Sequence, residues 1–315
     1  MEINRIVVAG GGVLGSQIAF QAAYCGFDVT IWLRSEESIT RTKPKLDNLK
    51  KVYIDTIRKM ATPEGQTTDV WANGIADHET FDEELCIEKV EKAYASITLE
   101  LDLETAVKDA DLVIESMAER EDEKIAFYKL LAPLLSEQTI LVTNSSSFLP
   151  STFAKYTGRP EKYLSLHFAN NIWISNTAEV MAQDKTDSKY FDQMLAFAED
   201  IRMVPLPVRI EKAGYLLNSM LMPLLVSAMD LYANGISDPE SVDKAWTLGT
   251  GAPVGPFQIL DIVGLATAHN IVRKHLKIPS FLAPYNFKAI EKMLRGYIEE
   301  GKLGVSSGEG FYKYD

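Results

Sequence analysis

The sequence predicts an α/β fold in which a doubly wound, mostly parallel sheet is followed by an all-α domain. Short apolar runs of strand length alternate with helical patterns along the N-terminal part of the chain. A glycine-rich turn joins the first run to the first helix, and beyond about residue 209 only helical patterns and Gly/Pro turns occur. At 315 residues the chain is long enough for two domains, which we place at residues 1–209 and 210–315.

The first predicted strand, residues 3–8, runs directly into a G-x-G-x-x-G turn that contains Gly10, Gly12 and Gly15. The first glycine of such a turn permits the sharp bend, the second lets a pyrophosphate approach the backbone, and the third allows close helix-to-strand packing. The N-terminus of the helix that follows would face the phosphates. A second strand at residues 27–33 completes a β-α-β unit, so the turn predicts a Rossmann dinucleotide-binding domain.

The end of the second strand bears on which dinucleotide binds. An NAD-type site has Asp or Glu about 20 residues beyond the glycines, where it accepts hydrogen bonds from the ribose 2′-OH. Leu33 ends the strand here, and Arg34 and Ser35 follow, a guanidinium and a hydroxyl that suit a 2′-phosphate. Alternatively, Arg34 is a solvated loop residue or stacks on adenine, while Glu36 or Glu37 reaches the ribose. We favour NADP over NAD.

A long helical excursion, predicted as a hairpin over about residues 38–94, separates the second strand from the third. Apolar residues at helical spacing predict its two helices, and a loop with proline and glycine lies between them. The first helix is rich in lysine, with Lys50 and Lys51 among them, in a chain of formal net charge −12. These lysines form either an anion-binding surface or an ordinary solvated helix face, two interpretations to which we give similar weight.

The sheet resumes after the excursion. Strand-like runs lie at residues 95–101, 111–115, 139–143, 163–167, 178–181 and 203–208. Ligands of a doubly wound sheet bind beyond the carboxyl ends of its strands, so the residues there are candidates for the site. Glu119 follows one of these strands, and Asn144-Ser145-Ser146-Ser147 follows another.

Composition argues against several classes of partner. The chain has 46% hydrophobic and 24% charged residues, as soluble globular proteins do, and its negative charge argues against nucleic acid or an anionic membrane as partner. Its two cysteines, Cys25 and Cys86, predict neither a disulfide framework nor a metal site. We find no apolar run of membrane-spanning length and no signal-peptide pattern, and therefore expect a cytoplasmic protein.

Among the four histidines, His167 alone follows a strand of the predicted sheet. An enzyme that uses a nicotinamide needs a group that takes or gives the hydroxyl proton while hydride moves, and histidine has a suitable acidity. We therefore predict His167 as that group. Glu179, on a neighbouring strand, could orient the imidazole and balance the imidazolium charge, although its spacing fits an exposed glutamate at a strand edge equally well.

Several ordered blocks occur along the chain: Asn144-Ser145-Ser146-Ser147, His167-Phe168-Ala169-Asn170, Glu179, residues 213–218 (AGYLLN), 251–257 (GAPVGPF) with Leu260-Asp261, and 307–314 (SGEGFYKY). In order and spacing, these blocks resemble the 3-hydroxyacyl-CoA dehydrogenase family along nearly the whole chain. The resemblance implies the reversible oxidation of an L-3-hydroxyacyl-CoA, which we expect to be short, to the 3-ketoacyl-CoA with hydride transfer to NAD(P)+. It also implies a site in a cleft between the two domains.

The resemblance implies roles for four residues at the reacting centre. By the family's pattern, His167 is the general base and Glu179 orients it. Ser146 and Asn218 would hydrogen-bond the oxygens of the substrate.

The resemblance also implies where the cofactor, the coenzyme A moiety and a second subunit bind. Glu119 and Lys124 match positions on the nicotinamide side, and the basic helix with Lys50 and Lys51 falls where the family binds coenzyme A. The helical C-terminal domain would form a homodimer. The predicted cofactor-binding residues are Gly10, Gly12, Val13, Leu14, Gly15, Arg34, Ser35, Glu119, Lys124, Asn144 and Asn170.

The chain departs from the family's pattern in two further places besides Leu33. Asn171 stands where the family usually has proline, and the excursion is longer than expected around residues 62–82. A changed excursion would suit a second candidate, a dehydrogenase of the same fold that acts on a free 3-hydroxy acid of the sugar-acid or carnitine type. A third candidate is a dinucleotide-binding protein without catalytic activity.

Overall fold

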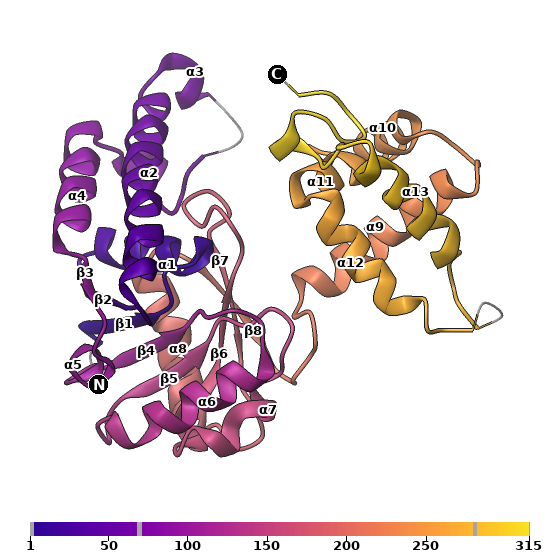
Figure 1. Ribbon diagram of the computed structural model, residues 1–315. Coiled ribbons are helices and arrows are strands. Elements are labelled where there is room, and N and C mark those ends of the chain that lie inside the picture. The colour runs from indigo at the N-terminus through magenta and orange to yellow at the C-terminus, as the bar shows by residue number, and fades with distance from the viewer. Residues whose placement is uncertain (1–2, 68–70, 280–281, 315) are drawn as a thin grey trace. The chain divides into compact units, whose positions relative to one another are not determined.

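The computed structural model describes residues 3–67, 71–279 and 282–314. It divides into two compact units, of which the first ends at Leu216 and the second begins at Leu217 (Figure 1). The first unit is a sheet with helices on both faces, and the second is helical. The predicted fold class, an α/β domain followed by an all-α domain, is confirmed.

The described part of the first unit contains an eight-stranded sheet in the order β3-β2-β1-β4-β5-β6-β7-β8. The strands are β1 (Arg5–Ala9), β2 (Asp28–Trp32), β3 (Thr98–Glu100), β4 (Leu112–Glu115), β5 (Ile140–Thr143), β6 (Tyr163–Phe168), β7 (Thr177–Met181) and β8 (Val204–Val208). Neighbours pair in parallel except β6 and β7, which are antiparallel. The strand order reverses beside β1, so the crevice at the carboxyl ends of β1 and β4 is where a ligand is expected.

Alternate residues of β1 face opposite sides of the sheet, because successive side chains of a strand point in opposite directions. Ile6 and Val8 belong to one apolar core, and Val7 and Ala9 belong to another. The helices of the first core are α1 (Val13–Tyr24), α2 (Glu36–Met60), α4 (Glu83–Ser96) and α8 (Ser188–Asp200). Those of the second are α5 (Leu103–Val107), α6 (Glu121–Leu131) and α7 (Pro150–Phe153). Strands covered on both faces explain the continuous apolar runs of the sequence.

The predicted excursion is present as α2 and α4, with the short helix α3 (Pro63–Gln66) after α2. Apolar residues at helical spacing form the buried face of α2, as the sequence predicts. Of the lengthened stretch 62–82, residues 68–70 lie outside the described residues. The part that follows returns to the sheet domain, where the Gly74 N–H donates to the Trp173 carbonyl at 3.1 Å and the Gln21 amide donates to the Gly74 carbonyl at 2.8 Å.

The second unit contains the helices α9 (Leu217–Ala233), α10 (Pro239–Thr250), α11 (Pro256–Val263), α12 (Leu265–His275) and α13 (Phe287–Glu299). Two buried carboxylates lie against its glycine-rich blocks, because a Cβ on Gly255 would collide with Asp243 and one on Gly310 would collide with Asp261. Asp243 accepts hydrogen bonds from the Phe257 and Gln258 N–H groups at the start of α11, and Asp261 accepts from the N–H groups of Phe311 and Tyr312. Among the described residues of the whole chain, no helix combines the length and apolar character needed to cross a membrane.

Candidate active site

The glycine turn has the geometry that a dinucleotide requires. Gly10 has φ of +121°, and a Cβ there would lie 2.6 Å from the Ser116 carbonyl oxygen. A Cβ on Gly15 would collide with the Gly10 carbonyl, whereas one on Gly12 would meet no atom within 4 Å. Since Gly12 is the N-cap of α1, no side chain covers the free N–H groups of the first turn, which can therefore meet a pyrophosphate. The turn fits a dinucleotide, the class of cofactor that the sequence predicts.

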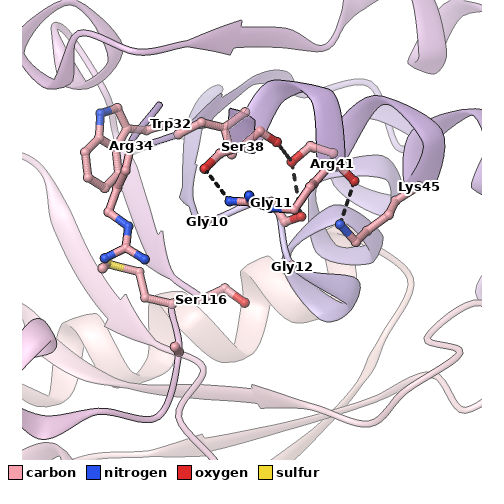
Figure 2. Close-up of a pocket in the computed structure, with 13 residues that line it drawn as sticks. Gly10, Gly11, Gly12, Trp32, Arg34, Ser38, Arg41, Lys45 and Ser116 are labelled. Carbon is pink, nitrogen blue, oxygen red and sulfur yellow. Dashed lines mark hydrogen bonds between the residues drawn. The ribbon is translucent and has the colours of Figure 1, made fainter. Parts of the chain in front are cut away.

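A cavity of about 210 Å³ lies over this turn and the end of β2 (Figure 2). Among the described residues that line it are the cations Arg34, Arg41 and Lys45, and no carboxylate. Leu33 also lines it, so the acid of an NAD-type site is replaced here by an apolar side chain. The cavity therefore offers positive charge where the ribose of a dinucleotide is expected.

The cations of the cavity are held by neighbours on α2 and α6. The Arg34 guanidinium lies 2.8 Å from the Glu123 carboxylate, which balances part of its charge. Arg41 donates to the Ser38 hydroxyl at 3.1 Å, and Lys45 donates to the Arg41 carbonyl at 2.7 Å. Ser35 caps α2 by accepting the Ser38 N–H. Sequence reasoning missed Arg41 and counted Lys45 only among the lysines of the basic helix, although residues 38, 41 and 45 share one face of a helix that begins at Glu36.

Two other residues predicted to bind the cofactor lie at the start of α1. Val13 is its first residue and is 62% exposed, which is unusual for valine and leaves its side chain available to a ligand. Leu14 is half-buried against the core of the first unit. Their contact with a dinucleotide stays a prediction.

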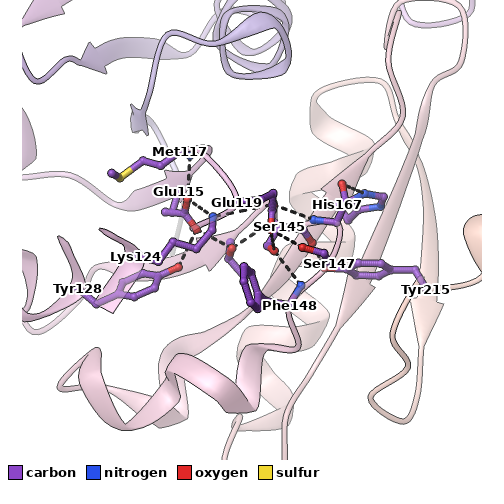
Figure 3. Close-up of polar contacts among 12 residues, drawn as sticks. Glu115, Met117, Glu119, Lys124, Tyr128, Ser145, Ser147, Phe148, His167 and Tyr215 are labelled. Atoms are coloured by element: carbon purple, nitrogen blue, oxygen red, sulfur yellow. Dashed lines mark hydrogen bonds and ion pairs between the residues drawn. The ribbon is translucent and has the colours of Figure 1, made fainter. Parts of the chain in front are cut away.

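Glu115, the last residue of β4, and Lys124 of α6 form a fully buried ion pair (Figure 3), with both side chains at 0% exposure and 2.6 Å between Nζ and Oε1. The Glu115 carboxylate also accepts hydrogen bonds from the Tyr128 and Thr143 hydroxyls and from the Met117 N–H. The Lys124 ammonium is 4.0 Å from Glu119. In this structure Lys124 stabilises the loop after β4, and its predicted contact with the cofactor stays a prediction.

Glu119 is hydrogen-bonded to the serines that follow β5 (Figure 3). Its carboxylate accepts hydrogen bonds from the Ser145 hydroxyl at 2.8 Å, the Ser147 hydroxyl at 2.7 Å and the Ser146 N–H at 3.2 Å. On the other side of the loop, the Asn144 side-chain oxygen accepts the Phe168 N–H at 3.1 Å. The loop that carries Ser146 is therefore fixed to the loop after β4 and to β6.

The structure brings His167, Glu179 and Ser146 together. The antiparallel register of β6 and β7 places His167 opposite Glu179, with 2.9 Å between Nδ1 and Oε2, and only 5% and 3% of these residues is exposed. The Ser146 hydroxyl lies 2.9 Å from Nε2 of the same ring. A carboxylate at Nδ1 favours the tautomer that carries its proton there, which leaves Nε2 to exchange a proton with a ligand.

Two further residues contact this pair, and sequence reasoning missed both roles. The Tyr215 ring stacks on the His167 ring with 4.3 Å between centroids and 10° between planes. The Leu216 N–H donates to the second Glu179 oxygen, Oε1, at 2.8 Å. Both positions belong to the block 213–218 that resembles the family, but no contact was predicted for either.

Comparison with known proteins identifies the family. Residues 5–211 match the family model described as 3-hydroxyacyl-CoA dehydrogenase, NAD binding domain, and residues 214–314 match the model described as 3-hydroxyacyl-CoA dehydrogenase, C-terminal domain. The chain belongs to the 3-hydroxyacyl-CoA dehydrogenase family. The resemblance drawn from the ordered blocks is thereby confirmed, and so is a nicotinamide dinucleotide as the class of cofactor.

Relatives of this dehydrogenase match along its whole length. The probable 3-hydroxybutyryl-CoA dehydrogenase of Bacillus subtilis (strain 168) is 30% identical over 100% of this chain and 99% of its own. The mitochondrial hydroxyacyl-coenzyme A dehydrogenase of Homo sapiens is 29% identical over 99% and 91%. A solved structure of a diketoreductase, described by its substrate-directed dual catalysis of dicarbonyl compounds, is 43% identical, covers 100% of both chains and has a TM-score of 0.84.

Four other predicted site residues of the dehydrogenase lie on three different segments of the chain. Asn170 is exposed just after β6, and Asn218 lies in the first turn of α9, in the second unit. The Lys50 ammonium is 2.6 Å from Glu91 and 4.9 Å above the Tyr94 ring, so it links α2 to α4. Lys51 is exposed. Of the two lysines, Lys51 is the freer to meet a coenzyme A phosphate.

Asn171 has a conformation that proline cannot adopt. Its φ is +58°, whereas the proline ring holds φ near −65°. Its N–H, which proline lacks, donates to the Gln17 side-chain oxygen at 2.9 Å. The departure from the family's pattern at this position is thus accompanied by a specific contact with α1.

Proposed function

We propose that this chain catalyses the reversible oxidation of an L-3-hydroxyacyl-CoA, of short acyl chain, to the 3-ketoacyl-CoA, with His167 as general acid and base. The observation that carries the proposal is the buried contact of His167 with Glu179 on one ring nitrogen and with Ser146 on the other. The dinucleotide, when bound, accepts or donates the hydride.

The residues of the chain move the proton and hold the oxygen. In oxidation, Nε2 of His167 takes the proton of the substrate hydroxyl, and Glu179 stabilises the imidazolium that forms. In reduction, His167 returns this proton to the developing oxyanion, and the Ser146 hydroxyl donates a hydrogen bond to the same oxygen. Asn218 is assigned to the substrate by the family's pattern, and Glu119 acts by holding the Ser146 loop.

A second function has specific support, namely reduction of a dicarbonyl compound that carries no coenzyme A. The diketoreductase is 43% identical to this chain, and the curated hydroxyacyl-CoA relatives quoted above are 29–30% identical. Lys50 is also engaged by Glu91 rather than free. Both points favour a substrate without coenzyme A. The reaction itself would be unchanged, because the contacts of His167 with Glu179 and Ser146 serve either substrate.

One comparison of substrates tests the proposed function. We expect kcat/KM for acetoacetyl-CoA to exceed that for ethyl acetoacetate by about tenfold or more, since the coenzyme A moiety adds binding energy. Lys51→Ala should raise the KM for acetoacetyl-CoA and leave that for ethyl acetoacetate unchanged, and Lys92→Ala on α4 is the matched control. A preference for ethyl acetoacetate would favour the second function, and no hydride transfer to either compound would contradict both.

We further propose that the dehydrogenase prefers NADP. The support is the cavity over the glycine turn, with Leu33 at the acidic position and Arg34, Arg41 and Lys45 in its lining. Ser35, predicted to bind the 2′-phosphate, caps α2 and adds its hydroxyl at the same end of the helix. A guanidinium paired with a phosphate is a strong, charge-assisted interaction.

Binding measurements separate these cations from the rest of the site. We expect NADPH to bind at least about tenfold more tightly than NADH in fluorescence titrations. Arg34→Asp and Arg41→Ala should each weaken NADPH by about tenfold and change the Kd of NADH by less than about twofold. Arg58→Ala, exposed at the far end of α2, is the control. Equal affinity for both dinucleotides in the unmodified protein would contradict the preference.

A homodimer formed through the second unit is also proposed. Its support is the family's pattern together with large apolar side chains exposed on that unit, such as Ile236 at 67%, Leu248 at 84% and Ile262 at 65%.

A further inference from the structure

The two hydrogen bonds of His167 act at the edge of its ring and, together with the Cβ–Cγ bond, restrain the tilt of the ring least. They reach the two ring nitrogens, Nδ1 from Glu179 and Nε2 from Ser146, at 2.9 Å each. Rotation of the imidazole about the line that joins these nitrogens changes both distances little. It does change the direction of the Nε2 lone pair, and proton transfer depends on that direction. A contact on the face of the ring therefore adds the restraint on tilt that the two hydrogen bonds provide least.

Tyr215 supplies that contact. Its ring lies parallel to the imidazole, at 4.3 Å between centroids and 10° between planes, and only 1% of the residue is exposed (Figure 3). Its hydroxyl donates to the Ser145 carbonyl at 2.7 Å. Burial raises the pKa of the Tyr215 phenol, so this hydrogen bond persists at neutral and alkaline pH. The tyrosine ring is thus fixed at its own far end and packed in the core.

The backbone before and after Tyr215 is shaped for this contact. Gly214 and Tyr215 have φ of +83° and +51°, and a non-glycine residue is uncommon in that region. Such a conformation persists where the surroundings determine it. This conformation lets two consecutive residues contact the His167–Glu179 pair: Tyr215 stacks on His167, and the Leu216 N–H donates to Glu179.

We propose that Tyr215 is a positioning residue for proton transfer, whose ring holds the imidazole of His167 at the angle that aims Nε2 at the substrate oxygen. The face of the tyrosine also stabilises the imidazolium that forms during oxidation, as aromatic faces stabilise cations. The inference rests on the proposed function of His167.

Three variants test it. Tyr215→Phe keeps the ring and removes the hydroxyl, whereas Tyr215→Leu removes both and keeps a Cβ at the same positive φ. Phe197→Leu is the control, because Phe197 on α8 is 1% exposed and its ring contacts the ring of Phe27. We expect Tyr215→Leu to lower kcat by about tenfold or more, with the Kd of the dinucleotide and the KM of acetoacetyl-CoA within about twofold. Tyr215→Phe should retain about half of kcat or more, and Phe197→Leu should lower the melting temperature without lowering kcat.

A second readout needs no turnover. Diethyl pyrocarbonate modifies accessible histidines, and mass spectrometry of peptides gives the rate at His167 relative to His269 in the same sample. We expect Tyr215→Leu to raise this ratio several-fold and Tyr215→Phe to leave it unchanged. If Tyr215→Leu raises the ratio but the unmodified protein reduces no substrate, the proposed function is refuted, whereas the positioning of the His167 ring by Tyr215 is supported.

Two results would overturn the inference. An unchanged ratio and an unchanged kcat in Tyr215→Leu would show that the ring does not position His167. An equal loss of kcat in Tyr215→Phe and Tyr215→Leu would assign the effect to the hydroxyl and the Ser145 loop instead.

Discussion

His167→Gln lowers kcat by at least about a hundredfold, with the dinucleotide bound nearly as tightly as before. Glutamine fills much of the space of the imidazole and can still hydrogen-bond to Glu179 and Ser146, but it cannot take up and return a proton at neutral pH. Hydride transfer would then have to create an unprotonated oxyanion or rely on water. The cavity over the glycine turn does not include His167, so the Kd of the cofactor should change by less than about twofold.

Single-turnover measurements with acetoacetyl-CoA and saturating dinucleotide isolate this loss from product release. His269→Gln is the matched control, because His269 is also hydrogen-bonded to a glutamate, Glu291, at 3.1 Å, but lies on α12 of the second unit. The His269→Gln variant should reduce acetoacetyl-CoA at the normal rate. Turnover within about threefold of normal in His167→Gln would remove this residue from the proton-transfer role.

Lys124→Met lowers the free energy of unfolding by about 3–5 kcal/mol. Both members of the Glu115–Lys124 pair have 0% side-chain exposure, so the variant leaves a carboxylate charge buried without its cation. The hydrogen bonds that Glu115 accepts from Tyr128, Thr143 and the Met117 N–H stabilise that charge only in part. Urea unfolding followed by circular dichroism measures the loss.

Two further variants test whether the loss of stability comes from the buried charge of Glu115. Lys129→Met, on the exposed face of the same helix, should cost less than about 1 kcal/mol. Glu115→Gln combined with Lys124→Met removes both charges and should recover part of the lost stability. If the free energy of unfolding of Lys124→Met lies within about 1 kcal/mol of that of the original protein, Glu115 and Lys124 are not buried as a charged pair.

Local patterns predicted the sheet and the core of the site well. Apolar runs of strand length were sufficient for the strands, because buried strands of a doubly wound sheet are apolar on both faces. The contact of His167 with Glu179 was one of two interpretations that the sequence left open, and the antiparallel register of β6 and β7 supplies it. The glycine turn could be predicted because each glycine has a steric reason that does not depend on distant residues.

Contacts between distant parts of the chain could not be predicted in this way. The stack of Tyr215 on His167 depends on a positive φ that a non-glycine residue rarely adopts. The pairing of Lys50 with Glu91 depends on how α2 packs against α4. Nothing in the sequence around Lys124 indicates that this lysine, alone among the charged residues of α6, is completely buried.

The hydrogen bond between Gln17 and Asn171 joins the helix after the glycine turn to the loop after β6. Gln17 is 5% exposed, so its side-chain oxygen needs a donor, and a proline at 171 would provide none. Conversely, a residue at 171 with a free N–H in the left-handed region gains from an acceptor at 17. The residue at each position thus limits which residue fits at the other. We expect positions 17 and 171 to covary among descendants of a common ancestor, because a change at one position alone would lose the hydrogen bond.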